Sequence, residues 1–197
     1  TALLPHGDSD IPLDGGAVRL DRMILERVGA LPPESRALLR GVAVAGDPLP
    51  QRALAAAAEV EFGSDTWQRN ITSLIEQCLV RRSGRQGEDL VETYHDRIRE
   101  AIVGSLDEST SRQVHAALAR AIEAWDRERS DMLARYWLSA ADHERAKHYA
   151  CEAATEARAK LAFERAAELF ETAASLESDA AARAALLRNA GECRASS

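Results

Sequence analysis

Apolar side chains recur every three or four positions over residues 17–31, which predicts a helix with one buried face. Gly29 ends this pattern, and a second helical pattern follows directly. Pro33 lies in the first turn of that second helix, where a missing N–H costs nothing. The two buried faces are expected to contain Val18, Leu20, Ile24, Leu25 and Val28, and then Leu38, Leu39, Val42 and Val44.

Two more helices are predicted before residue 79. The third begins after Pro50 and is rich in alanine, the best helix former. The fourth begins at Ser64 or Asp65, because either side chain can cap the free N–H groups of a first turn. Its inner face is expected to contain Trp67, Ile71, Leu74, Ile75 and Cys78.

The helical pattern stops at Leu79. Two short runs with β character, "LVRRS" and "DLVETY", follow and are separated by "GRQGE". A short polar connection with two glycines predicts a hairpin. Another helix comes next, with Ile98, Ala101, Ile102 and Leu106 on one stripe. Three helices, a hairpin and a helix stand in the order of a winged helix.

From residue 109 onward the pattern is almost wholly helical. Helices are predicted over 109–127, 131–141, 143–158, 160–176 and 180–194. The short connections favour antiparallel neighbours. Ala166, Phe170 and Ala173 have the spacing of the second helix of a tetratricopeptide repeat, in which small residues allow close helix packing. The segments "ERAKHYACEAA" and "LLRNAGEC" follow the same logic more weakly.

The predicted fold class is therefore mainly α. Residues 1–16 are interpreted as a linker, and residues 17–106 as a winged-helix domain with a preceding helix and one small β-hairpin. Residues 107–197 are interpreted as a tetratricopeptide-like α-solenoid. A repeat needs neighbours to bury its faces, so this solenoid is expected to be truncated.

Charge and cysteine content narrow the possible partners and location. The net charge is −7, whereas nucleic-acid affinity comes mostly from Lys and Arg on phosphates, so a nucleic-acid partner is disfavoured. Arg81, Arg82 and Arg85 of the hairpin are more simply explained as a solvated surface. Three separated cysteines without a CxxC pair indicate a reducing cytoplasm. No apolar run is long enough to cross a bilayer, so no membrane partner is expected.

Catalytic and metal motifs are missing from the sequence. It contains no phosphate-binding G-x-x-x-x-G-K-[ST] loop, no G-x-G-x-x-G and no G-x-S-x-G, so the chain is not expected to be an enzyme. The segment "HERAKH" resembles a zinc-protease motif, but His143 and His148 are five positions apart instead of four. They would therefore diverge around the helix axis by about 140°.

A histidine and an aspartate stand side by side in "TYHDRIREAI", at the junction of the hairpin and the next helix. Asp96 can cap that helix and is favoured by the helix dipole. His95 has no comparable structural role in this interpretation. Its side chain is expected to point away from the core, towards an adjoining domain.

"YHDRIREAI" resembles the His-Asp motif at the end of the winged-helix domain in STAND-class signal-transduction ATPases. The order of the segments around it is similar to the region that follows the nucleotide-binding core in large bacterial regulators of this class. The resemblance covers about residues 17–176. It implies a role in signal transduction by protein–protein interaction.

The resemblance also implies particular residue roles. In the family the motif histidine reaches the phosphates of bound ADP and locks a closed, inactive state, and this role falls on His95, with Asp96 holding the local turn. ATP or ADP is therefore implied for the full-length protein and no cofactor for this fragment. The implied partners are another protein or neighbouring domains of the same polypeptide. A free-standing helical-repeat adaptor and a winged-helix transcriptional regulator remain as alternatives.

Overall fold

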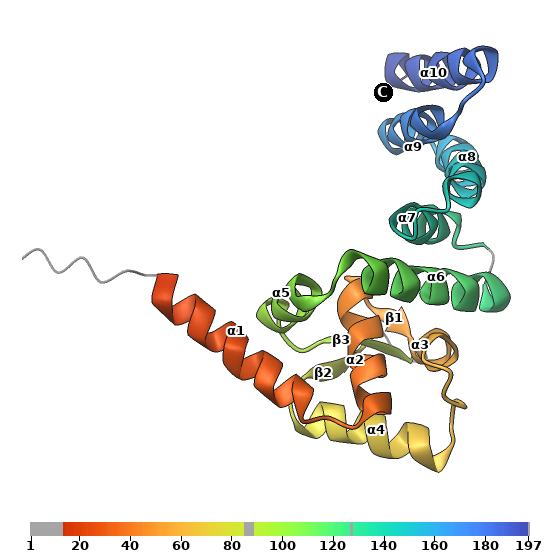
Figure 1. Ribbon diagram of the computed structural model, residues 1–197. Helices are drawn as coiled ribbons and strands as arrows, with labels where there is room; N and C mark the ends of the chain where they lie inside the picture. Colours follow the sequence, from red (N-terminus) through yellow and green to blue (C-terminus); the bar gives the residue numbers. More distant parts are fainter. Residues whose placement is uncertain (1–13, 85–88, 127, 197) are drawn as a thin grey trace, which may run out of the picture.

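A computed structural model describes residues 14–84, 89–126 and 128–196, with side chains described from residue 19 onward. Within these residues the protein is mainly helical (74% helix) with ten helices and one small antiparallel sheet of three strands. Figure 1 shows two parts: an N-terminal group of helices around the sheet, and a C-terminal stack of helices that extends away from it.

The helices are α1 (Asp14–Gly29), α2 (Pro33–Ala45), α3 (Gln51–Ala57), α4 (Asp65–Glu76), α5 (Asp96–Ser105), α6 (Glu108–Trp125), α7 (Ser130–Ser139), α8 (His143–Ala159), α9 (Phe163–Leu176) and α10 (Ala180–Ala195). The strands are β1 (Leu49–Pro50), β2 (Val80–Ser83) and β3 (Leu90–Thr93). No helix among the described residues is both long and apolar enough to cross a membrane.

Several predicted helix ends are confirmed. Pro33 begins α2, and Gly46 ends it in the left-handed conformation with φ of 75°. Ser64 caps α4, because its Oγ accepts a hydrogen bond from the backbone N–H of Trp67 at 3.2 Å. The predicted start of the first helix at residue 17 is wrong, since α1 already includes residues 14–16. Glycine lowers helix propensity by about 1 kcal/mol but does not forbid helical geometry.

The rest of the predicted linker, residues 1–13, lies outside the described residues. From residue 19 onward α1 projects from the N-terminal part (Figure 1).

The predicted hairpin is confirmed as β2 and β3, which pair antiparallel with Val80 opposite Thr93. A third strand, β1, was not predicted. It is two residues long and pairs with the other edge of β3, with Leu49 opposite Val91. Proline has no backbone N–H to donate to a neighbouring strand, so Pro50 in the sequence argues against a strand at this place. The structure tolerates Pro50 because β1 is an edge strand.

The N-terminal core lies between α2, α3, α4 and the sheet. Gly41 of α2 allows close packing, because a Cβ atom there would lie 2.7 Å from Cδ1 of Leu54 in α3. The largest core side chains that are less than 2% exposed in this part are Leu38, Leu39, Leu49, Leu54, Trp67, Ile71, Leu74 and Ile102.

The predicted inner face of α4 is wrong at its C-terminal end. Trp67, Ile71 and Leu74 are buried, but Ile75 is only partly buried and Cys78 is exposed. The reason is that α4 ends at Glu76, and Cys78 takes the left-handed conformation with φ of 54°. A residue beyond the helix end no longer follows the stripe of the helix.

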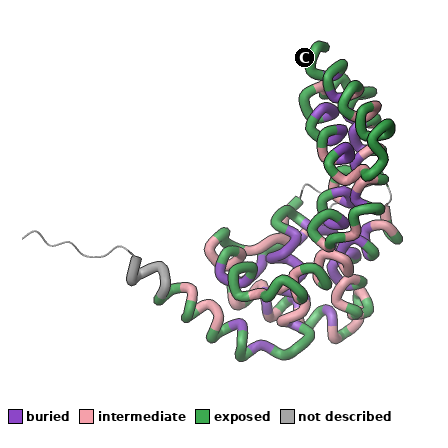
Figure 2. The backbone as a smooth tube through the Cα atoms, turned by 45° about the horizontal axis from the view of Figure 1, so that its top comes forward, coloured by how far each residue is buried: buried purple, intermediate pink, exposed green. Residues whose placement is uncertain are grey.

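The C-terminal part is a stack of antiparallel helices from α6 to α10 (Figure 1). Buried residues run along the seam between successive helices, and exposed residues cover the outside (Figure 2). The seam is built mostly from alanine, as in Ala146, Ala150 and Ala153 of α8, all of which are buried. Small side chains let the helix backbones approach closely, as the sequence pattern predicts.

Two of the helix connections in this stack are the same turn. Ala141 and Leu161, twenty residues apart, both have φ of 61°. In each turn the next residue donates back to the helix: Asp142 N–H to Trp137 O at 3.0 Å, and Ala162 N–H to Ala157 O at 2.9 Å. The sequence carries the matching signal as "HERA" over 143–146 and "FERA" over 163–166, a repeat that the tetratricopeptide spacing alone does not reveal.

Candidate functional site at the start of α5

The His-Asp pair lies where β3 passes into α5. The backbone N–H of Tyr94 donates to the carbonyl of Leu79 at 3.0 Å, which fixes the chain just after the strand. His95 follows in an extended conformation with φ of −150° and ψ of 144°. Its carbonyl accepts from the N–H of Ile98 at 2.9 Å, so the first turn of α5 closes directly on His95.

The helix cap is His95 and not Asp96, which corrects the prediction from the sequence. Nδ1 of His95 accepts a hydrogen bond from the backbone N–H of Arg97 at 3.1 Å. Asp96 is the first residue of α5 and is exposed, where its charge complements the helix dipole. A capping side chain must stand just before the helix, and the helix begins one residue later than an Asp96 cap requires.

The cap determines which nitrogen of the His95 ring carries the proton. Nδ1 must be unprotonated to accept from Arg97, so the neutral ring has its proton on Nε2. This tautomer is assigned from the hydrogen bond. The side chain is exposed, so Nε2–H remains a donor for a group outside the helix. An imidazole held in this way suits an anionic acceptor.

His95 and Asp96 line a pocket of about 240 Å³ between the α2–β1 connection and the sheet. Two ion pairs lie around it. Arg81 Nε lies 3.0 Å from Glu92 Oε1 across β2 and β3. Asp47 Oδ2 lies 2.6 Å from Arg135 Nη2 of α7. Asp96 adds a further carboxylate to the lining, so the charged side chains around the pocket sum to a net negative charge.

Arg99 of α5 lies against the end of α2. A Cβ atom on Gly46 would be 3.2 Å from Nη2 of Arg99, and glycine suits both this close contact and the left-handed backbone. A cation at this place complements the negative end of the α2 dipole. The Nε atom of Arg99 is buried and has no hydrogen-bond partner among the described residues.

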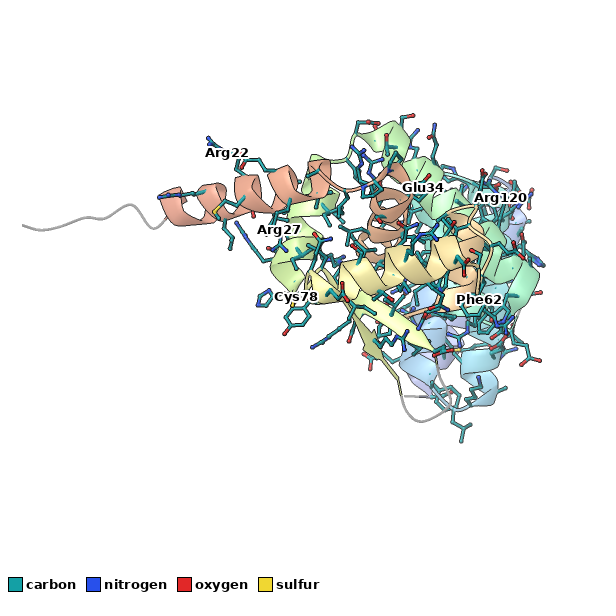
Figure 3. The ribbon with its side chains drawn as sticks, turned by 90° about the horizontal axis from the view of Figure 1, so that it is seen from below. Arg22, Arg27, Glu34, Phe62, Cys78 and Arg120 are labelled. Atoms are coloured by element: carbon teal, nitrogen blue, oxygen red, sulfur yellow. The ribbon has the colours of Figure 1, made fainter. Side chains whose placement is uncertain are left out.

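Two arginines hold α1 against the hairpin-bearing part. Arg97 Nη2 lies 2.8 Å from Asp21 Oδ2 of α1. Arg27 Nη2 donates to the carbonyl of Gln77 at 3.0 Å, and Figure 3 shows Arg27 and Cys78 where α1 reaches the C-terminal end of α4. The first contact links residues 76 positions apart, so helical spacing gave no signal for it.

Behind the pocket, Arg135 lies near the half-buried His115 of α6 and the buried Tyr136 of α7. Burial, together with the charge of Arg135, lowers the pKa of His115, whose Nδ1 lies 2.9 Å from the carbonyl of Ser111. Burial raises the pKa of Tyr136 to about 12. Both side chains are therefore uncharged at neutral pH.

The predicted repeat residues lie elsewhere, in α9. Ala166 and Ala173 are fully buried, and Phe170 is 3% exposed. Phe170 packs in a cluster formed by α8, α9 and α10, with Ala154 and Ala190 among its members. Figure 1 places this cluster in the stack, away from α5, so the structure does not bring these residues together with His95.

Other candidate residues lie on the surface. Arg82 is exposed, and Arg85 falls outside the described residues. His148 Nε2 lies 3.3 Å from Glu152 on the same helix. In the described part of the chain, no group of three or more His, Cys, Asp and Glu residues could hold a metal ion.

Comparison of the chain with protein-family models, with curated proteins and with solved structures gave no match. The interpretation of the His95 site therefore depends on the residues of the chain itself.

Proposed function

We propose that this chain is a non-catalytic regulatory segment of a STAND-class signal-transduction ATPase in the bacterial cytoplasm. In this proposal the hairpin-bearing part docks onto a nucleotide-binding core, and the helical stack binds a protein or ligand. Docking favours a closed, inactive state, and binding of the partner to the stack favours an open state.

The observation that carries the proposal is the position of His95. The side chain caps α5 through Nδ1, is exposed, and has Nε2–H as its remaining donor. A helix cap is a rigid attachment, so the ring is pre-organised and an acceptor that reaches it costs little ordering entropy. The phosphate of ADP is such an acceptor, and Asp96 supports the turn through its charge in the first helical turn.

The arrangement of the N-terminal part also supports the proposal. We interpret residues 17–106 as a winged helix, with β2 and β3 as the wing. The order α2, β1, α3, α4, β2, β3 follows the order of that fold, and the three strands form one antiparallel sheet. α1 precedes it, attached through Arg97–Asp21, and would link the winged helix to a preceding core.

We interpret residues 107–197 as tetratricopeptide-like repeats. Alanine-lined seams and the repeated turn at Ala141 and Leu161 support this interpretation. A stack of this kind offers an extended side surface for a partner, because each helix contacts only its neighbours. This makes the stack a suitable sensor element.

A DNA-binding role has less support. Arg81 on the hairpin pairs with Glu92 at 3.0 Å, which reduces its charge towards phosphate. Asp65 and Glu76, at the two ends of α4, would oppose phosphate. A free-standing adaptor would use the stack in the same way but would leave His95 without a partner.

The test uses the complete polypeptide in which this chain stands beside a nucleotide-binding core. His95→Ser keeps an oxygen that can cap α5 but is too short to reach a phosphate, whereas His95→Ala removes both functions. We expect both variants to lose bound ADP faster and to show higher basal activity. Arg82→Ala, an exposed change on the hairpin, is the control. Unchanged ADP retention in both His95 variants would refute the proposal.

A further inference from the structure

A second pocket lies where the sheet meets the C-terminal end of α6. It has a volume of about 400 Å³, and its lining includes Pro50, Gln51, Leu90, Trp125 and Arg129. These residues come from three segments that are far apart in the sequence, and Figure 1 shows α3 lying beside α6. Small-molecule sites have volumes of about 300–1,000 Å³ and often lie between structural units.

Gln51 contributes a polar group that the described residues do not satisfy. The residue is only 4% exposed, and its Nε2 has no hydrogen-bond partner among the described residues. Its backbone N–H donates to the carbonyl of Asp89 at 2.9 Å, which fixes the residue beside β3. A buried amide without a partner destabilises a fold, so such a group calls for an acceptor. A ligand in the pocket can supply that acceptor.

Trp125 gives the pocket an aromatic wall. It is 45% exposed, whereas the other two tryptophans of the chain, Trp67 and Trp137, are buried. The guanidinium of Arg129 lies 5.4 Å from the centre of the Trp125 ring, and its Nε is 3.0 Å from Asp126 Oδ2. The pocket therefore combines a flat aromatic surface with a guanidinium that Asp126 positions and whose charge Asp126 reduces.

We propose that this pocket binds a small planar heteroaromatic anion of the mononucleotide class. The ring stacks on Trp125, a ring nitrogen accepts from Nε2 of Gln51, and the anionic group lies against Arg129. Bases stack on tryptophan, a glutamine amide matches the donor–acceptor edge of adenine, and guanidinium groups suit phosphate. Asp89 disfavours a ligand with several negative charges.

This site is independent of the role proposed for His95, which lines a different pocket. A ligand bound here would contact both β3 and the C-terminal end of α6. It would thereby stiffen the connection between the sheet and the helical stack. Because all the lining residues belong to this chain, the site can be tested without a nucleotide-binding core.

The test is a titration of the 197-residue chain with adenosine 5′-monophosphate, followed by tryptophan fluorescence. Trp125 is the exposed tryptophan, so saturable quenching reports on this pocket. Adenosine and ribose 5-phosphate each lack one half of the ligand. We expect adenosine to bind at least about tenfold more weakly and ribose 5-phosphate not to bind at about 1 mM.

Variants assign the binding to individual side chains, with affinity measured by calorimetry. We expect Trp125→Ala and Gln51→Met to weaken binding by at least about tenfold. Arg120→Ala changes an exposed residue of the same helix and should leave the affinity unchanged. Because Gln51→Met removes a buried amide without a partner, it should also leave the melting temperature the same or raise it by about 2–4 °C.

Four results would overturn the proposal. The first is no saturable quenching by adenosine 5′-monophosphate, and the second is equal binding of ribose 5-phosphate. The third is unchanged affinity in both pocket variants. The fourth is a lower melting temperature for Gln51→Met, because that result would show that the protein itself satisfies the amide.

Discussion

Nδ1 of His95 accepts a hydrogen bond from the backbone N–H of Arg97 at 3.1 Å, and this bond begins α5. The same bond leaves the proton of the neutral ring on Nε2. One side chain therefore combines a structural role, as a helix cap, with a donor that is available to another domain. The two roles can be separated by substitution, because they use different ring nitrogens.

The first prediction concerns the structural role of His95. His95→Ala removes the cap and should lower the free energy of unfolding of the chain by about 0.5–2 kcal/mol. His95→Ser restores a capping oxygen and should stay within about 0.5 kcal/mol of the original chain. Urea denaturation of both variants measures this difference. Equal losses of stability would show that the Nδ1 bond does not support α5.

The second prediction concerns the turn between α8 and α9. Leu161 has φ of 61° and is 73% exposed, so its side chain contributes strain at the backbone and little packing. Leu161→Gly should raise the free energy of unfolding by about 1 kcal/mol, since glycine adopts the left-handed conformation without steric cost. Leu161→Ala keeps the strain and serves as the control. A glycine variant no more stable than the alanine variant would contradict the assigned turn.

The third prediction compares two helical glycines. A Cβ atom on Gly41 would lie 2.7 Å from Cδ1 of Leu54, whereas nothing lies within 4 Å of a Cβ atom on Gly104. Gly41→Ala should therefore destabilise the fold by about 1 kcal/mol through overpacking. Gly104→Ala should stabilise it by about 0.5–1 kcal/mol through helix propensity. Thermal unfolding of each variant shows whether its stability rises or falls. Stabilisation in both variants would argue against the close contact of α2 with α3.

The fourth prediction concerns pH. Burial lowers the pKa of His115 in the folded state below its ordinary value of 6.5. The unfolded chain takes up a proton near pH 6.5, and the folded chain does so only at lower pH. The stability contributed by the neutral side chain is thus present above pH 6.5 and is lost as the pH falls through the folded-state pKa.

His115→Gln keeps a polar side chain but cannot titrate, so the decrease in stability between about pH 7.5 and pH 5.5 should be smaller in this variant. Chemical denaturation across this range measures the two slopes. His148→Gln, an exposed histidine on α8, is the matched control. If His115→Gln and the original chain lose stability in parallel, the half-buried His115 does not set this pH dependence.

Local signals in the sequence predicted much of the fold. Pro33 and Ser64 mark helix starts by their own backbone and side-chain chemistry, and the structure confirms both. The hairpin was predicted in the same way, from two short runs and a polar connection. These features depend on neighbouring residues only, so one sequence is sufficient to find them.

Features that depend on tertiary contacts were missed. β1 forms because Leu49 pairs with Val91, which lies in a distant segment. The ion pair between Arg97 and Asp21 likewise joins two segments that are distant in the sequence. The cap was assigned to Asp96 because aspartate is the usual capping residue, whereas the start of α5 makes His95 the cap. Trp125 stands at the end of α6 and is exposed, and helical spacing alone does not reveal that.

The central claim is that the surface around His95 docks onto a nucleotide-binding core when ADP is bound. Hydrogen exchange of the complete polypeptide tests it most directly, because the backbone amides of residues 94–99 lie at that surface. We expect these amides to exchange more slowly with ADP bound than with ATP bound, and His95→Ser to abolish the difference. Equal exchange of this segment in both nucleotide states would contradict the claim.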